Sequence, residues 1–184
     1  MEHIYYYHTD IGVIGIVDYE SDEKAKEKKS VITHILLEQM PIPLTYLEKE
    51  TSVIQNMAEQ IQEYIAGLRY TFDIPYELQG TPFQQKVWNA LTKIPYGETR
   101  SYKEIAIQTG NEHASRAIGM ANHKNPLPIL IPCHRVIGAN GALVGYGGGL
   151  QMKKILLDIE ATHIRNQIKE EYDNDRNQGF NKDI

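Results

Sequence analysis

The sequence predicts a small α/β unit followed by a mainly helical part. Residues 4–17 are rich in β-branched and aromatic side chains, which are typical of strands. Apolar residues then recur at helical spacing after Thr51, and two more helices begin with capping signals at Thr81 and Ser101. A chain of 184 residues is long enough for one medium domain or two small ones. We place the boundaries at residues 1–78 and 79–162, with a polar tail at 163–184.

The N-terminal unit begins with two predicted strands. Asp10 and Gly12 interrupt residues 4–17 and indicate a turn between the strands. Residues 22–29 are charged and fit an exposed loop or a short helix, and residues 31–37 fit a third strand or a continuation of that helix. Pro41 and Pro43 interrupt the next segment. A helix follows from Thr51, with its apolar face at Ile54, Met57, Ala58, Ile61, Ile65 and Leu68.

The second part begins with an extended segment at residues 70–78 and continues as helices. Thr81 is the predicted N-cap of the first helix, with Pro82 at the first helical position. Trp88 lies on the apolar face of this helix, where it is a core anchor. A second helix is predicted over residues 101–109, because Ser101 and Glu104 have the spacing of a capping box.

A further short helix and a longer one complete the second part. Gly110-Asn111 predicts a turn, and residues 113–122 predict a short helix of mostly small residues from which Arg116 projects. Helix, tight turn and helix form the helix-turn-helix pattern, which binds DNA in some proteins and is a plain packing unit in others. Residues 151–160 predict another helix, and the polar tail after Ala161 is expected to be frayed or disordered.

The charge of the chain is distributed unevenly. The formal net charge is -5, with -8 in residues 1–80, +4 in residues 81–160 and -1 in residues 161–184. A basic second part favours an anionic partner such as nucleic acid, although a basic face is also common on solvated surfaces.

The cysteine count and the hydropathy of the chain limit the classes to which the protein can belong. A single cysteine excludes an intramolecular disulfide framework and a cysteine-rich zinc site, and it fits a reducing, cytoplasmic location. The N-terminus lacks the basic start and apolar run of a signal peptide. No apolar run is long enough to span a membrane, so we expect no membrane partner.

The single cysteine, Cys133, is the best candidate for chemistry. It is followed directly by His134, and a glycine-rich run lies downstream at residues 145–149. A thiolate is a strong nucleophile for carbon, and a neighbouring imidazole can help to form it. The alternative is that Cys133 is a small buried hydrophobic residue without chemistry.

Residues 80–160 resemble the C-terminal domain of O6-alkylguanine-DNA alkyltransferases. The resemblance begins at Gly80-Thr81-Pro82-Phe83-Gln84-Gln85-Lys86-Val87-Trp88 and continues in order through Ile94-Pro95-Tyr96-Gly97, Ser101-Tyr102, Arg116-Ala117-Ile118-Gly119, Asn125-Pro126, Pro132-Cys133-His134-Arg135-Val136, Tyr146-Gly147-Gly148-Gly149, Lys153, Leu156-Leu157 and Glu160. The ordered set is specific, whereas any single piece is not. The first part of the chain resembles the family only in outline, and for it the family implies a ribonuclease-H-like topology.

The resemblance implies a Cys-His-Glu relay. Cys133 would accept the alkyl carbon, His134 would remove the thiol proton through a water, and Glu160 would orient the imidazole. Asn125 would hold the turn before the cysteine. The alternatives are a structural histidine, a solvated helix glutamate and a loop asparagine that precedes proline.

The resemblance also implies residues that bind substrate and DNA. Tyr102 would help to rotate the nucleotide outward and would bond the extruded base, and Arg116 would fill the vacated stack. Small residues beside it, among them Ala117, suit the minor groove. The pocket itself would be formed by Tyr146, the backbone N–H of Gly147 and the carbonyls of Cys133 and Val136, with Arg135 grouped among these contacts. A packed tyrosine, a surface arginine and a flexible glycine loop are the alternatives.

Partners and cofactors follow from the same resemblance. We expect double-stranded DNA with an alkylated guanine as the partner, a monomeric protein and no cofactor. Many family members have serine at the position of Gly147, so a hydroxyl contact is missing here. Some relatives bind zinc through N-terminal cysteines, and no cysteine precedes Cys133 in this chain.

Two other functions compete with alkyl transfer. One is a DNA-damage-binding or regulatory helix-turn-helix module in which the cysteine is a sensor or is inert. A Cys133→Ala variant separates the two, since transfer requires the thiol and binding does not. The other is a thiol hydrolase, which would need an oxyanion pocket that the sequence does not identify.

Overall fold

The computed structural model describes residues 1–21, 29–38 and 45–179, and it begins with a four-stranded sheet. The strands are β1 (Glu2–Thr9), β2 (Gly12–Glu20), β3 (Ser30–Leu37) and the short β4 (Leu47–Glu48), in the order β3-β2-β1-β4. β1, β2 and β3 are antiparallel neighbours, and β4 pairs with β1 in parallel. The two predicted strands and their turn are therefore confirmed.

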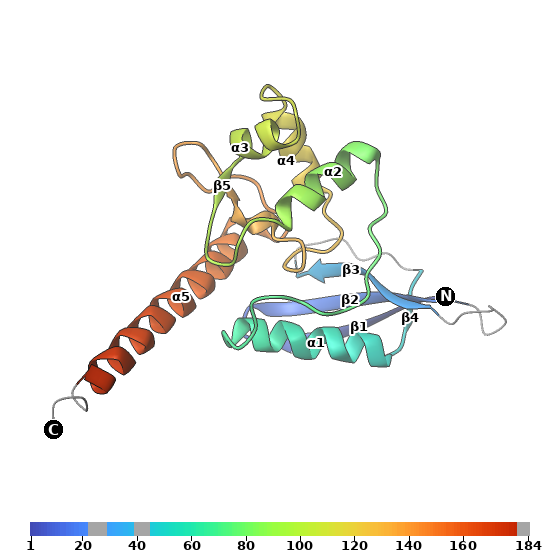
Figure 1. Cartoon of the computed structure of the whole chain (residues 1–184). Coiled ribbons are helices and arrows are strands. Elements are labelled where there is room, and N and C mark those ends of the chain that lie inside the picture. The colour runs from blue at the N-terminus through green and yellow to red at the C-terminus, as the bar shows by residue number, and fades with distance from the viewer. Residues whose placement is uncertain (22–28, 39–44, 180–184) are drawn as a thin grey trace.

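The structure also decides between the alternatives for residues 31–37, which form strand β3. The interpretation of residues 22–28 as a loop or helix, and of Pro41 and Pro43 as breaks, lies outside the described residues. The predicted helix after Thr51 is α1 (Ser52–Ile65), and the Thr51 side chain accepts a hydrogen bond from the Ile54 N–H as its N-cap. α1 packs its apolar face against the sheet (Figure 1).

Three short helices gather on one side of the sheet part (Figure 1). They are α2 (Pro82–Leu91), α3 (Tyr102–Gln108) and α4 (Ser115–His123). Capping boxes at Thr81 and Ser101 begin α2 and α3, as the sequence predicts. Trp88 is buried, and its indole N–H donates to the Ala121 carbonyl at 2.9 Å, which ties α2 to α4 and confirms Trp88 as a core anchor.

Short extended segments connect these helices to the rest of the chain. In residues 70–78, the predicted extended segment, only Tyr76 makes a bridge, and its partner is Ile32 of β3. β5 (Arg100–Ser101) and β6 (Val136–Ile137) pair in parallel, and β6 directly follows η1 (Cys133–Arg135), a single 3₁₀ turn. This pairing places the cysteine motif beside the start of α3.

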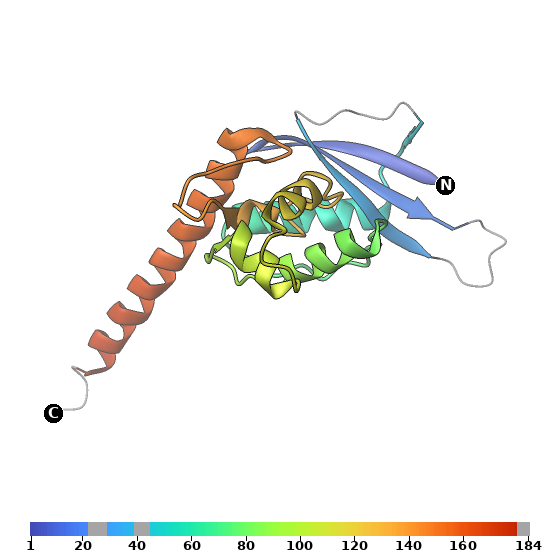
Figure 2. The ribbon, with the colours of Figure 1, turned by 90° about the horizontal axis from the view of Figure 1, so that it is seen from above.

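The C-terminal helix is longer than predicted. α5 runs from Gly149 to Gly179, so the expectation of a frayed or disordered tail after Ala161 is wrong up to Gly179. The tail is polar, but residues 150–178 contain neither proline nor glycine, and polarity alone does not stop a helix. α5 buries its first turns and then extends away from the body (Figure 2). Among the described residues, no helix has a stretch long and apolar enough to cross a membrane.

One buried hydrophobic cluster joins the sheet part and the helical part. It includes Ile35 of β3, Ile61 of α1, Leu91 of α2 and Leu156 of α5, together with Cys133. The fold is thus a mixed α/β part with a mainly helical part, and the cysteine motif lies within the core that they share.

Candidate active site

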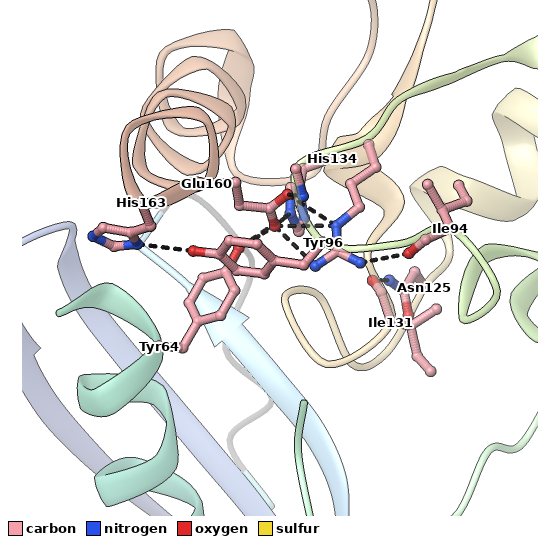
Figure 3. Close-up of polar contacts among 10 residues, drawn as sticks. Tyr64, Ile94, Tyr96, Asn125, Ile131, His134, Glu160 and His163 are labelled. Carbon is pink, nitrogen blue, oxygen red and sulfur yellow. Dashed lines mark hydrogen bonds and ion pairs between the residues drawn. The ribbon is translucent and has the colours of Figure 1, made fainter. Parts of the chain in front are cut away.

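Cys133 begins the 3₁₀ turn η1 and is only 4% exposed. The side chain of Asn125 organises the loop before it. Its amide N–H group donates to the Ile131 carbonyl at 2.9 Å and to Sγ of Cys133 at 3.1 Å, while its oxygen accepts from the Leu127 N–H at 3.0 Å. Asn125 therefore closes the loop through its bond to Ile131 (Figure 3), and it also contacts the sulfur.

The thiol of Cys133 needs help to ionise. Burial raises its pKa to about 11, even though the hydrogen bond from Asn125 and the nearby Lys153 ammonium both favour the thiolate. At neutral pH the free protein therefore holds a protonated thiol, and a nucleophilic reaction requires a base close to it.

His134, the next residue in the sequence, is the candidate for such a base. The ring is fully buried, and its Nε2 atom lies 2.8 Å from Oε1 of Glu160. A carboxylate accepts only, so we assign the ring proton to Nε2. Nδ1 is buried without a hydrogen-bond partner in the described part of the chain, and in this tautomer it can accept a proton. Burial lowers the pKa of His134, although Glu160 acts in the opposite direction.

Glu160 of α5 is buried and receives donors on both carboxylate oxygens. Oε2 accepts from the Gly97 N–H at 2.9 Å and from Nε of Arg135 at 3.1 Å. Oε1 accepts from His134, from Arg135 and from the hydroxyl of Tyr64. Burial by itself would raise the pKa of Glu160, but the hydrogen bonds and charges of His134 and Arg135 outweigh it and hold the pKa at about 2. The carboxylate is therefore ionised beside the imidazole.

Arg135 is not at a substrate-binding surface, which corrects its grouping with the DNA and substrate contacts. Its Nη2 atom lies 2.9 Å from Glu160, and Nη1 donates to the Ile94 carbonyl at 2.7 Å. The Arg135 side chain is buried, and its guanidinium pairs with the Glu160 carboxylate. A buried carboxylate is stable only when it is paired in this way. Arg135 therefore holds Glu160 in place.

Tyr64 is a residue of this site that sequence reasoning missed. It lies on the buried face of α1, fully buried, and its hydroxyl donates to Glu160 at 2.5 Å. A tyrosine on an apolar helix face is read as core packing, and the partner is 96 residues away in the sequence. No local pattern identifies this contact.

A lysine and two tyrosines lie near Cys133. Lys153 is fully buried, and its ammonium donates to the carbonyls of Val136 at 2.5 Å and Val144 at 2.9 Å. Tyr102 donates to the same Val144 carbonyl at 2.9 Å. The hydroxyl of Tyr146 is buried and has no partner among the described residues, and both burial and Cys133 raise its pKa.

The backbone groups predicted to bind the base already have some partners. The Cys133 carbonyl accepts from the Val136 N–H, and the Val136 carbonyl accepts from Lys153. Each carbonyl oxygen has a second lone pair that a ligand can use. Gly147 is half-buried beside the buried Gly148, whose neighbour is the side chain of Leu37.

Arg116 and Ala117 lie apart from the buried cluster, on the exposed side of α4. Met120, one turn later, is 59% exposed. The structure thus brings Asn125 to Cys133, and it gathers His134, Arg135 and Tyr64 around the Glu160 carboxylate. It leaves Arg116 and Ala117 on the surface. No group of three or more histidine, cysteine, aspartate or glutamate side chains within the described ranges could hold a metal ion.

The fold and this site define a class of protein with a buried cysteine followed by a histidine whose imidazole binds a buried carboxylate. Residues 82–162 match the family model of the 6-O-methylguanine DNA methyltransferase DNA-binding domain.

Similar proteins identify the family within this class. The constitutive methylated-DNA–protein-cysteine methyltransferase of Bacillus subtilis is 56% identical over 113 residues, which are 61% of this chain and 68% of that protein. The methylated-DNA–protein-cysteine methyltransferase of Mycobacterium bovis is 50% identical over 133 residues, 71% of this chain and 81% of that protein. The chain belongs to the methylated-DNA–protein-cysteine methyltransferase family.

Solved structures agree with this assignment. The crystal structure of the Mycobacterium tuberculosis O6-methylguanine methyltransferase has a TM-score of 0.78 and 42% sequence identity, and the match covers 89% of this chain and 94% of that one. The M. tuberculosis OGT in complex with DNA has a TM-score of 0.76 and 39% identity, with 88% and 94% covered.

Proposed function

We propose that this protein repairs DNA by moving an alkyl group from O6 of an alkylated guanine to Sγ of Cys133. The observation that carries the proposal is the buried Cys133 thiol followed by His134, whose ring is bound to the ionised Glu160. The names of the relatives and the DNA in one similar structure support the substrate.

The chemistry follows from the three side chains. Nδ1 of His134 takes the thiol proton through a bridging water, and Glu160 stabilises the imidazolium that results. The thiolate attacks the alkyl carbon in line, the new S–C bond forms as the C–O6 bond breaks, and the guanine leaves with the electron pair and takes up a proton. A thioether is not readily cleaved, so each molecule acts once, and the reaction needs no cofactor.

The surface residues supply the DNA contacts in this proposal. α3 and α4, joined by a turn at Gly110 with φ +89°, form a helix-turn-helix that enters the minor groove with Arg116 and Ala117. Arg116 occupies the stack that the extruded base leaves. Tyr102, Tyr146 and the backbone of Gly147 then form the walls around the base.

Three further parts of the proposal concern the topology of the first part, the domain boundaries and the oligomeric state. The strand order β3-β2-β1-β4, with β4 parallel to β1, supports a ribonuclease-H-like topology in the first part. We keep residues 1–78 and 79–162 as the two domains. The protein acts as a monomer, because one chain supplies all the side chains that the reaction needs.

The test uses a short duplex with one O6-methylguanine. The protein is incubated with it, and intact mass and peptide mapping then locate any modification. One methyl group on Cys133, with no further conversion once the protein is consumed, is the expected result. Cys133→Ala should bind the duplex and remain unmodified. Binding by the wild type with an unmodified Cys133 would favour a damage-binding module, and multiple turnovers would favour a hydrolase.

A further inference from the structure

The N-terminal part of the chain contributes a hydroxyl group to the Glu160 carboxylate. Tyr64 lies in the last turn of α1, and its side chain is fully buried. Its hydroxyl donates to Oε1 of Glu160 at 2.5 Å and lies 3.3 Å from Nε2 of His134 (Figure 3). Oε1 of Glu160, Nε2 of His134 and the hydroxyl oxygen of Tyr64 thus lie close together. Glu160 belongs to α5, His134 to η1 and Tyr64 to α1.

The ring of Tyr64 is held so that the hydroxyl has little freedom. It packs edge-on against Tyr96, with ring centroids 5.6 Å apart, and at the same distance against Phe72. Burial and Glu160 raise the pKa of Tyr64 well above its usual value, so the hydroxyl remains a neutral donor. A fixed donor restricts where the accepting carboxylate oxygen can lie.

Arg135 and Gly97 restrain Glu160 from other directions. Gly97 contacts Oε2, and the guanidinium of Arg135 spans both oxygens. Tyr64 is a neutral donor to Oε1, the oxygen that also accepts from His134. Its own lone pairs lie close to Nε2–H, where a positive charge develops when the imidazole accepts a proton.

We propose that Tyr64 is a positioning residue for alkyl transfer: its hydroxyl holds Oε1 of Glu160 against Nε2 of His134 and supports the imidazolium. The proposal rests on the function proposed above. It makes α1 of the N-terminal part a component of the relay, and it assigns a positioning role to a residue that otherwise resembles core packing.

The first test separates the rate of transfer from DNA binding. Tyr64→Phe keeps the ring and removes only the hydroxyl. With saturating O6-methylguanine duplex, the single-turnover rate constant should fall about fivefold, as expected for one hydrogen bond, while Kd for an unmodified duplex stays the same. Tyr7→Phe is the matched control, because Tyr7 also donates to a glutamate, Glu50 at 2.6 Å, but on the exposed surface of the sheet part. It should match the wild type.

The second test asks whether Tyr64 acts through Glu160. In a Glu160→Gln background the Tyr64→Phe change should have little further effect, because the carboxylate that it positions is absent. A Tyr64→Phe variant with the wild-type rate would overturn the proposal. So would a fivefold loss that persists unchanged in Glu160→Gln, since the effect would then be structural.

The third test does not depend on the DNA reaction. Iodoacetamide alkylates Cys133 directly, and its rate at neutral pH should also fall about fivefold in Tyr64→Phe. If the wild type accepts no methyl group, the proposed function fails, while these alkylation rates still decide the role of Tyr64. If Tyr64→Phe does not fold, site-specific 3-fluorotyrosine at position 64 replaces it. Its hydroxyl is more acidic and therefore a stronger donor to Oε1 of Glu160, so a changed rate of alkylation is expected, and an unchanged rate overturns the proposal.

Discussion

The amide of Asn125 donates to Sγ of Cys133 at 3.1 Å, and the same nitrogen donates to the Ile131 carbonyl at 2.9 Å. One side chain thus fixes the loop and contacts the nucleophile. Its oxygen also accepts the Leu127 N–H, and the whole side chain is buried. The shape of the loop and the ionisation of the thiol therefore depend on the same residue.

Asn125→Ala should impair both stability and reactivity. The change leaves the buried Leu127 N–H unpaired and removes one of the two hydrogen bonds that the Ile131 carbonyl accepts, the other coming from the Cys133 N–H. We therefore expect the free energy of unfolding to fall by about 2 kcal/mol in urea titrations. The pKa of the Cys133 thiol should rise further, because Asn125 favours the thiolate, and iodoacetamide should react more slowly. Asn140→Ala removes the same type of bond, to the Ala142 N–H, in an exposed turn and should change little. Equal effects of the two substitutions would contradict the assignment.

Acid should remove the stabilisation that Glu160 provides. The pKa of Glu160 is depressed to about 2 in the folded protein from an ordinary value of 4.5. A depressed carboxyl pKa contributes stability above the unfolded value, and this contribution is lost as the pH falls through the folded value. The free energy of unfolding of the wild type should therefore exceed that of Glu160→Gln at neutral pH, and the two should converge between pH 4.5 and about 2.

Glu59→Gln removes an exposed glutamate of α1 and controls for the loss of one charge. Urea titrations across the acid range provide the comparison. A difference between wild type and Glu160→Gln that stays constant with pH would show that Glu160 is not held ionised by its partners.

Local patterns in the sequence predict much of the fold. β-Branched and aromatic residues predict β1 and β2, and capping residues predict the starts of α2 and α3, because the physical signal lies within a few residues of each element. The far end of α5 was missed for the opposite reason. Polar composition predicts disorder here, although the segment lacks any residue that breaks a helix.

The relay was only partly predictable. Cys133 and His134 are adjacent, and the family resemblance supplies Glu160, but Arg135 and Tyr64 acquire their roles from contacts 25 and 96 residues distant. An arginine beside a catalytic motif in a basic segment is read as a DNA contact, whereas the structure turns it inward to balance a buried charge. Such pairings arise from tertiary packing, and the spacing of residues in the sequence does not reveal them.

Arg116→Ala should reduce repair of duplex DNA without changing stability. Arg116 is exposed on α4, so the free energy of unfolding should remain within about 0.5 kcal/mol of the wild type. If Arg116 fills the vacated stack, it offsets part of the cost of unstacking a base. Without it, the transfer rate on an O6-methylguanine duplex should therefore fall on the order of tenfold. A single-stranded substrate needs no such replacement, and the defect should largely disappear there.

The matched control for Arg116 is Arg165→Ala. Arg165 is exposed on α5, which extends away from the helices that carry Arg116 (Figure 1). It should behave as the wild type on both substrates. An Arg116→Ala defect of equal size on single and double strands would instead indicate a simple electrostatic contact.

Alanine substitutions at Gly97 and Gly141 distinguish the energetic cost of a strained backbone from the cost of a steric clash near Glu160. Both have left-handed φ angles, +78° and +79°. A Cβ at Gly141 would meet nothing within 4 Å, whereas a Cβ at Gly97 would lie 2.7 Å from Cγ1 of Ile164 on α5. Gly141→Ala should therefore cost about 1 kcal/mol, the ordinary penalty of this conformation, and Gly97→Ala about 3 kcal/mol, because the contact must also relax.

The same pair of variants tests whether the backbone of Gly97 supports the relay. The Gly97 N–H donates to Oε2 of Glu160, so a shift of this segment away from Ile164 would weaken that bond. Gly97→Ala should slow methyl transfer at a temperature where it remains folded, and Gly141→Ala should not. Stability is measured by urea titration and transfer by single-turnover assays. A Gly97→Ala variant that is destabilised but transfers at the wild-type rate would show that Arg135, His134 and Tyr64 are sufficient to hold the carboxylate.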